Sequence, residues 1–424
     1  MSVVNIRPTP PRTAAETALI EGFGRRFSDL PGDPVVAGKR DDAVEAIKAG
    51  LPTRRVEAWH YTDLRRLLAQ VPDHDVTLAA QSLPAVLEGS VVLPVLNGVA
   101  GVSPRIEGAT ADRLAARLQD GSFAPALGPR DEADAIGAIN TAFAADGHFL
   151  DIAAGATLAD PVELQNVQAG GQVHVRHAVR AGAGSRATIV ERQTGEGDAL
   201  VSSVSHLTVG EGAEIVWVLV QDQPDGATHL GQFNAELAKD AKLTLFVLNA
   251  GSKLVRQEIR VGVVGEGADF TLRGVNLLAG ETHCDVTMML DHAAPHTGST
   301  EIIRNVITDR ARGVFQGQIR VAKEAQKTDA KMACNTLLLS DEADFSTKPE
   351  LEIFADDVAC GHGATVTEID RDHLFYLMAR GVDEKAARGL LIKAFVAEVV
   401  EDLDDEAMVD ALEQRLDDWF AEHG

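Results

Sequence analysis

The sequence is poor in cysteine, in aromatic residues and in positive charge. Its three cysteines (Cys284, Cys334 and Cys360) are too few, and odd in number, for a disulfide framework, which indicates a reduced, cytoplasmic compartment. Aromatic residues make up only 4% of the chain, which argues against base-stacking surfaces. The formal net charge is −25, with 39 basic against 64 acidic residues. Such a chain should repel nucleic acid and anionic lipid, so neither is an expected partner.

Long hydrophobic runs are also missing. The most apolar stretch, 91–102, is interrupted by Pro94, Asn97, Gly98 and Gly101, so we expect no segment to span a membrane. The first residues, MSVVNIRPTPPRTAAE, lack the apolar run of a signal peptide. The chain length of 424 residues predicts two or three domains of a soluble protein.

Residues 1–145 are predicted to form a mixed, mostly helical region. Apolar residues recur at helical spacing over 13–27, and Asp41 and Asp42 are expected to open a short helix that Gly50 and Pro52 end. The next segment, LPTRRVEAWHYTDLRRLL (51–68), sets Trp59 among several arginines. It could form a site for an anion or a partner, but taken alone it favours an amphipathic segment that Trp59 anchors.

From residue 146 the pattern changes to short runs of Val, Ile, Leu and Thr between small residues, which is typical of strands. Small turns recur at Gly184, Gly212, Asp240 and Gly267, in steps of 28, 28 and 27 residues, and Ala156 lies 28 residues before the first. A fixed period in this range predicts coils that stack on one another. We therefore expect a mainly β fold, with a β-solenoid over residues 146–369 whose repeat fades after about residue 280.

The remaining residues, 370–424, are predicted to form a helical domain. Asp370 can cap a helix that Gly381 ends, and Asp383 can cap a second one. A third helix, 404–422, places five large apolar residues on one face: Met408, Leu412, Leu416, Trp419 and Phe420. The acidic surface of this region is either simply solvated or a docking surface for another subunit.

The stretch DDVACGHGATVTEID (356–370) holds a cysteine and a histidine two positions apart. On a strand, Cys360 and His362 would share one face, while Gly361 and Gly363 leave room for a close approach. A thiolate and an imidazole suit zinc or iron–sulfur chemistry, although two ligands cannot close a tetrahedral site. The spacing alone favours a structural cysteine that packs as a small hydrophobe.

Three segments resemble the SufB/SufD family of the SUF iron–sulfur cluster assembly system. They are RRVEAWHYTDLRRL near the N-terminus, DHAAPHTGSTEIIRNVITDRARGVFQGQ (291–318), and the pair GHGAT and HLFYLMARGVDEKAARGLLIKAF near the C-terminus. The resemblance implies a right-handed parallel β-helix between helical ends. It also implies a scaffold role in a complex with a SufB paralogue and the SufC ABC-type ATPase, which builds clusters with sulfur from a cysteine desulfurase.

The same resemblance assigns roles to single residues. It places His362, preceded by Cys360, at the interface between the two paralogues, where a transient Fe–S cluster would form. Ala343 stands where the SufB branch carries a cysteine, so the departure points to the SufD branch and puts sulfur acceptance by this chain in doubt. We expect the ATPase to dock on the helical domain, 370–424. The family complex is associated with reduced flavin; the sequence leaves flavin binding, and a homodimer of the isolated chain, open.

The sequence offers two alternatives to a scaffold. A carbohydrate-active enzyme could use Asp291, His292, His296 and Arg304, but Pro295 breaks any helix that would align the two histidines. A zinc site could use His283 and Cys284 with His292 and His296, but adjacent residues on a strand face opposite sides. The sequence contains neither a GxxxxGK[ST] phosphate loop nor a GxSxG elbow. We therefore expect a non-catalytic subunit whose ATP hydrolysis comes from the partner.

Overall fold

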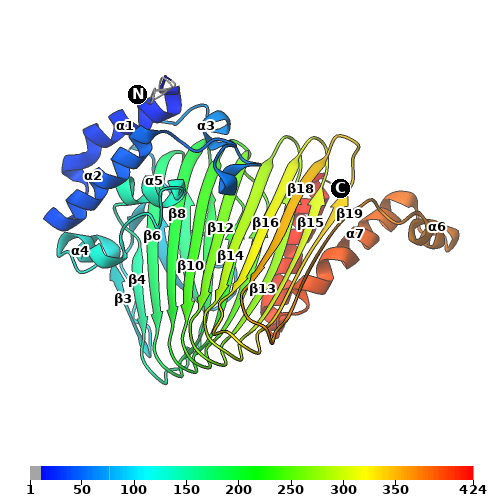
Figure 1. Cartoon of the computed structure of the whole chain (residues 1–424). Coiled ribbons are helices and arrows are strands. Elements are labelled where there is room, and N and C mark those ends of the chain that lie inside the picture. Colours follow the sequence, from blue (N-terminus) through cyan, green and yellow to red (C-terminus); the bar gives the residue numbers. More distant parts are fainter. Residues whose placement is uncertain (1–10, 76, 424) are drawn as a thin grey trace, which may run out of the picture.

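The computed structural model describes residues 11–75 and 77–423, and its centre is a parallel β-solenoid (Figure 1). Two sheets face each other, and each coil adds one strand to each of them. The first sheet contains β1 (Val91–Leu96), β2 (Val99–Ala100), β5 (Val162–Gln168), β7 (Arg186–Gly195), β9 (Glu214–Gln221), β11 (Lys242–Asn249), β13 (Asp269–Leu278), β15 (Gly298–Ile307), β17 (Asp329–Leu338) and β19 (Ala359–Thr367). The second contains β3 (Ala109–Arg113), β4 (His148–Ile152), β6 (Gly171–Ala181), β8 (Ala199–Val209), β10 (Thr228–Leu237), β12 (Leu254–Val263), β14 (His283–His292), β16 (Arg312–Val321) and β18 (Asp344–Ile353). The predicted β-solenoid is confirmed, and β1 to β3 extend its sheets upstream of residue 146.

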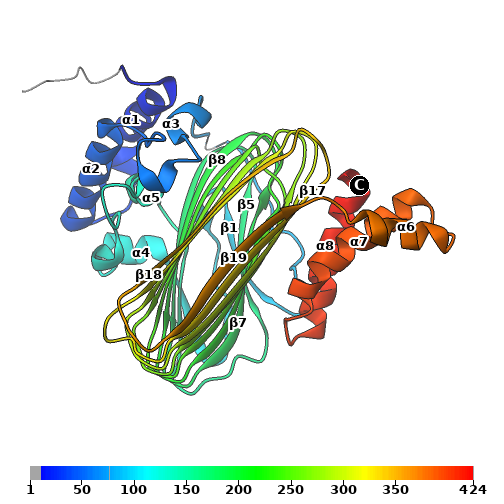
Figure 2. The same cartoon turned by 45° about the vertical axis from the view of Figure 1, so that its right-hand side comes forward.

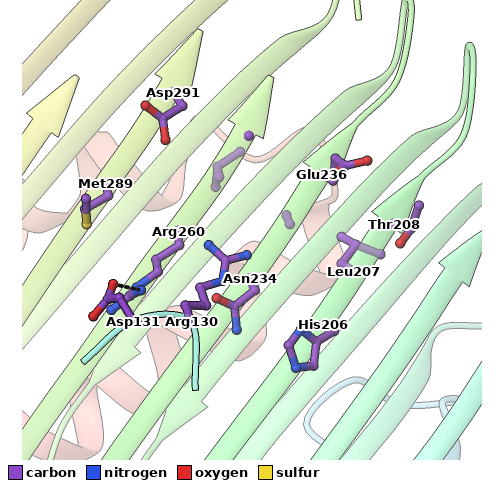
Figure 3. Close-up of a pocket in the computed structure, with 13 residues that line it drawn as sticks. Arg130, Asp131, His206, Leu207, Thr208, Asn234, Glu236, Arg260, Met289 and Asp291 are labelled. Carbon is purple, nitrogen blue, oxygen red and sulfur yellow. Dashed lines mark ion pairs between the residues drawn. The ribbon is translucent and has the colours of Figure 1, made fainter. Parts of the chain in front are cut away.

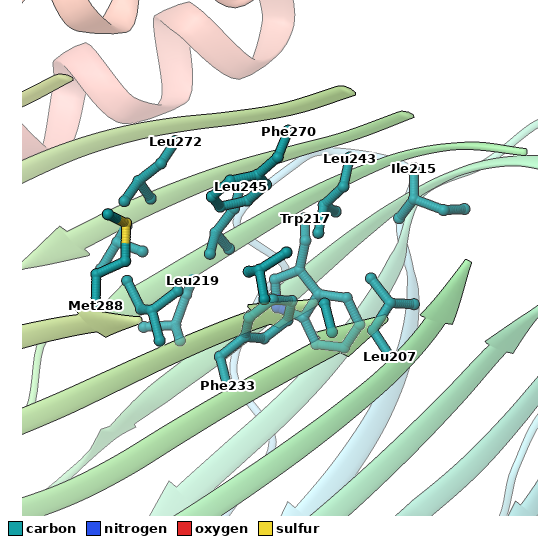
Figure 4. Packing of buried hydrophobic residues seen from close by; sticks show 14 of the residues in the cluster. Leu207, Ile215, Trp217, Leu219, Phe233, Leu243, Leu245, Phe270, Leu272 and Met288 are labelled. Atoms are coloured by element: carbon teal, nitrogen blue, oxygen red, sulfur yellow. The ribbon is translucent and has the colours of Figure 1, made fainter. Parts of the chain in front are cut away.

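The interior of the solenoid is filled by stacked apolar side chains from the two inner faces (Figure 4). Trp217 meets Phe233 of the opposite sheet edge-on, with ring centroids 5.0 Å apart. A polar ladder runs beside this core: Asn249 donates to Asn276 at 2.7 Å, Asn276 to Asn305 at 2.7 Å, and Asn305 to Thr336 at 3.0 Å. These amides hydrogen-bond along the stacking direction, which satisfies polar groups that would otherwise be costly to bury.

The turn that repeats in the sequence is a corner of the coil. Gly184, Gly212, Asp240 and Gly267 all have positive φ, between 53° and 73°, so the predicted equivalence is confirmed. The upstream member is wrong by one residue: Gly155, with φ 71°, occupies this corner instead of Ala156, because the corner needs a left-handed residue. The corner continues at His296 (φ 56°) and Lys327 (φ 65°). The repeat fades in the sequence because these residues replace the glycine, whereas the coil itself continues.

The N-terminal helices cover the outer face of the second sheet. They are α1 (Ala14–Arg26), η1 (Phe27–Asp29), α2 (Pro34–Ala49), η2 (Glu57–Trp59), α3 (Leu64–Leu67), α4 (Leu114–Gln119), η3 (Ala124–Ala126) and α5 (Ala135–Phe143). The expected start of α2 at Asp41 is wrong. The helix begins at Pro34, because the Asp33 side chain accepts a hydrogen bond from the Val36 N–H and proline suits the first helical position. Its end at Gly50 is confirmed.

The arginine-rich segment around Trp59 is a structural anchor. Trp59 is fully buried, its indole N–H donates to the Ala133 carbonyl at 3.1 Å, and the Arg256 guanidinium lies 4.5 Å from its ring centroid. Arg256 is itself buried in ion pairs with Asp285 and with Glu258 of the second sheet. The segment therefore fastens the N-terminal helices to the solenoid. This confirms its interpretation as an amphipathic segment that Trp59 anchors.

The C-terminal helices cover the outer face of the first sheet. α6 (Arg371–Ala379) and α7 (Glu384–Val400) begin at the predicted caps, and α8 (Glu406–His423) buries four of the five apolar residues assigned to its face. Ion pairs of 2.7–2.8 Å connect the helices with the solenoid: Arg304 with Glu398, Arg273 with Asp402, and Arg415 with Asp222. α6, in contrast, projects away from the solenoid (Figure 2). No helix in the described parts of the chain is long and apolar enough to cross a membrane.

Candidate functional site

The candidate site lies at the C-terminal end of the solenoid, where the last two strands leave their outer edges open (Figure 2). Among the described residues, β19 pairs only with β17, and β18 pairs only with β16. Half of the backbone N–H and C=O groups along such a strand point away from the sheet without a ladder partner. This end is therefore a template on which a further strand can pair.

Cys360 and His362 lie on the inner face of β19. Their partners in the parallel register are Ala330 and Met332, which are both buried in the core, so the predicted shared face is confirmed. The Cys360 side chain is half-buried against the edge of that core, and His362 is exposed. A Cβ placed on Gly361 would meet no atom within 4 Å, which leaves the predicted room for close approach.

Cys360 is the cysteine of this chain whose side chain is accessible from the surface. Cys284 and Cys334 are buried, and burial raises the pKa of the Cys334 thiol to about 12. Burial also raises the pKa of Cys360, but its side chain reaches the surface. No group of three or more Cys, His, Asp or Glu side chains within 11–75 and 77–423 could hold a metal ion. Cys360 and His362 thus form a pair of potential ligands without a third from the described part of their own chain.

The residues predicted for a zinc site do not lie together. Cys284 lies in the solenoid core, whereas the His283 ring contacts the Thr62 hydroxyl at 2.9 Å on the outer side of the sheet. His292 is buried and contacts the hydroxyl groups of Thr297 and Ser299. These neighbouring positions along the chain therefore do not converge on one zinc ion.

The four residues proposed for a carbohydrate-active site are also separated. Asp291 lies exposed at the end of β14 in the second sheet, and Arg304 belongs to β15 in the first sheet. Arg304 pairs with Glu398 of α7 at 2.7 Å, and His292 is buried. Because these side chains occupy different faces of the solenoid, they offer no common active site.

His362 is the last of a row of inward-facing residues at matching positions on successive strands of the first sheet. His362 lies opposite Met332, which lies opposite Glu301, a fully buried carboxyl. Neither oxygen of Glu301 has a hydrogen-bond partner in the described structure. Sequence reasoning missed this alignment, although the steps of 30 and 31 residues between the three positions match the length of a coil here.

Comparison with known proteins defines the class of protein. Residues 164–395, more than half of the chain, match the family described as SUF system FeS cluster assembly, SufBD core domain. The chain therefore belongs to the SufBD family of SUF iron–sulfur cluster assembly proteins.

Individual relatives agree with this assignment. The chain is 28% identical over 392 residues to the iron–sulfur cluster assembly protein SufD of Escherichia coli, which covers 86% of this chain and 88% of that protein. It is 28% identical over 402 residues to a SufBD family protein of Synechocystis, with 88% of both chains covered. A SufBD family protein of Mycobacterium tuberculosis is 26% identical over 396 residues, with coverage of 91% and 90%.

Proposed function

We propose that this chain is a SufD-type scaffold subunit, which pairs through the open end of its solenoid with a SufB-type paralogue. The observation that carries the proposal is the incomplete ligand pair, Cys360 and His362, on a strand whose outer edge is unpaired. A strand of the partner would complete the sheet edge and cover it. The same contact would bring the partner's side chains beside Cys360 and His362.

The cargo of this interface is a nascent Fe–S cluster. Thiolates hold such clusters, and histidine replaces cysteine in some of them. Because this chain would supply only one thiol and one imidazole, the remaining coordination positions of the cluster are left for ligands from the partner. Such partial ligation suits a cluster that must later be released. Ala343, half-buried before β18, offers no thiol for incoming sulfur, so sulfur from a cysteine desulfurase would enter through the paralogue.

The ATPase would dock on α6 and the adjoining turn of α7. Phe375 and Tyr376 of α6 are 73% and 57% exposed, and Leu390 of α7 is 52% exposed. This cluster is unusual in a chain with only 4% aromatic residues, and exposed apolar patches of this kind mark interaction sites. An ABC-type ATPase of the SufC class bound here would drive changes at the cluster site without a nucleotide site in this chain.

Co-purification tests the proposal. The tagged full-length chain is expressed with untagged SufB-type and SufC-type proteins from the same source, under anaerobic conditions. We expect all three to elute as one complex that carries Fe–S absorbance when a cysteine desulfurase, iron, cysteine and a thiol reductant, which reduces the transferred sulfur to sulfide, are supplied. A chain that elutes without either protein would contradict the proposed function.

Substitutions on α6 test the ATPase contact. Deletion of 371–424 would uncover the apolar outer face of the first sheet, since α7 and α8 pack there. The double variant Phe375→Ser with Tyr376→Ser leaves that packing intact. We expect it to weaken binding of the SufC-type protein by about tenfold or more while the SufB-type contact persists. Val35→Ser, which changes a residue of α2 that is 57% exposed, is the control. Unchanged ATPase binding by the α6 variant would place the contact elsewhere.

A further inference from the structure

A groove unrelated to the Cys360 end lies on the outer face of the second sheet (Figure 3). It has a volume of about 540 Å³, and its floor is formed by β8, β10, β12 and β14. The segment before α5, which carries Arg130 and Asp131, forms one side. A volume in this range suits a small molecule.

A neutral histidine supplies one hydrogen-bond donor. Nε2 of His206 lies 3.3 Å from Nη1 of Arg176, and because a guanidinium only donates, this ring nitrogen is the acceptor. Burial, with help from Arg176, lowers the pKa of His206 to about 3. The proton of the neutral ring therefore sits on Nδ1. The Nδ1–H group is a hydrogen-bond donor, and the ring carries no charge.

Asn234 adds a buried amide whose hydrogen bonding is incomplete. The residue is 2% exposed and lines the groove between His206 and Arg130 (Figure 3). Its nitrogen donates to the Gln232 side chain at 3.2 Å and to the Ser205 carbonyl at 3.5 Å, but its oxygen has no partner in the described structure. A buried amide with an unpaired end at the wall of a cavity is a position where a ligand completes the hydrogen bonding. Because both N–H groups of this amide already have acceptors, the groove receives its oxygen, which accepts a hydrogen bond from a donor of the ligand.

Two arginines supply the positive charge. Arg260 is held by Glu258 at 2.8 Å and Asp131 at 3.5 Å, whereas the Arg130 guanidinium has no ion pair with any described residue. Burial and the repulsion from Arg260 lower the pKa of Arg130. An anion bound beside Arg130 would relieve that repulsion.

The rim carries the opposite charge. Glu236 and Asp291 are exposed and line the groove, so the anionic part of a ligand must be compact. The rest of the ligand should offer hydroxyl or amino donors to these carboxylates. A tetrahedral oxyanion can accept from the Arg130 fork and the His206 N–H through different oxygens.

We propose that this groove binds the phosphate group of a small polar molecule, with Arg130 and His206 as the phosphate ligands. The Asn234 amide oxygen and the carboxylates of Glu236 and Asp291 then accept hydrogen bonds from hydroxyl groups of the same molecule. The groove lies on the second sheet, away from the C-terminal helices that cover the first sheet. It is therefore a ligand site separate from the cluster interface and the ATPase contact.

Isothermal titration of the full chain tests the proposal with three probes: inorganic phosphate, glycerol 3-phosphate and glycerol. We expect saturable binding of both phosphates and none of glycerol. Tighter binding of glycerol 3-phosphate than of phosphate would identify a phosphate-bearing molecule as the occupant, as proposed. Equal affinities would overturn the role of Glu236 and Asp291 and leave free phosphate as the source.

Two variants locate the binding. Arg130→Gln, in an exposed segment, removes the unpaired charge and should weaken phosphate binding by about tenfold or more. Asn234→Asp places a carboxylate at the floor and should abolish binding. Arg312→Gln, an exposed arginine of β16 that does not line the groove, is the matched control and should bind normally. Absence of saturable phosphate binding at millimolar concentration, or equal losses in Arg130→Gln and Arg312→Gln, would overturn the proposal.

Discussion

A His362→Ala variant should fold and assemble normally but lose most of its capacity to support cluster formation. His362 is exposed at the open end of the solenoid, so its removal leaves no cavity, and the unfolding midpoint should stay close to that of the unchanged protein. A ligand lost from an already incomplete set is expected to lower cluster yield by about tenfold or more. Thermal midpoint, co-purification and cluster absorbance are measured on the same preparations.

Two further variants serve as control and comparison in this experiment. His60→Ala removes an exposed histidine near the N-terminal helices and should change none of the three measurements. Cys360→Ser should show a milder defect than His362→Ala, because the family resemblance gives more weight to the histidine. A His362→Ala complex with normal composition and normal cluster yield would end the proposed role of this residue.

The starts of α6 and α7 and the glycine corners of the coil were predictable because single residues determine them. Asp370 and Asp383 cap helices through their own side chains, and Gly184 marks a corner that needs a left-handed backbone. The same logic fails where the residue is less specific. His296 and Lys327 occupy equivalent corners at some conformational cost, so the repeat becomes invisible in the sequence before the solenoid ends.

The site was predictable only in part. Two residues on one strand share a face by the geometry of the strand, so Cys360 and His362 could be placed together. The exposure of His362 could not be predicted, since it depends on β19 being the last strand of its sheet. The groove could not be predicted from the sequence for a related reason. Its polar residues come from a loop (Arg130) and two strands (His206 and Asn234), and only the stacking order of the coils brings them together.

Glu301→Met should stabilise the protein, and the gain should grow with pH. The Glu301 carboxyl is fully buried between Leu272 and Met332 on the inner ladder of the first sheet. Burial raises its pKa from 4.5 to about 8. Methionine has a similar length, carries no charge, and matches the apolar neighbours above and below, so the ladder can accept it.

The direction of the pH effect follows from proton binding. In the unfolded chain Glu301 loses its proton above pH 4.5, whereas in the folded chain it keeps the proton until about pH 8. Between these values the unfolded state binds fewer protons, so the contribution of Glu301 to stability falls as pH rises and is constant above about pH 8. At about 1.4 kcal/mol per pKa unit, the whole interval corresponds to about 5 kcal/mol.

Urea unfolding of the isolated chain at pH 5.5, 7 and 8.5 measures this contribution. We expect Glu301→Met to gain a little stability at pH 5.5 and up to about 5 kcal/mol at pH 8.5, as the charged form becomes increasingly unfavourable in the original protein. Glu211→Met, at an exposed corner, is the control and should give the same small difference at every pH. A stability difference for Glu301→Met that does not change between pH 5.5 and 8.5 would show that the Glu301 carboxyl ionises in the folded protein as it does in the unfolded chain. A water or an ion from outside the chain would then be needed to stabilise the buried carboxylate.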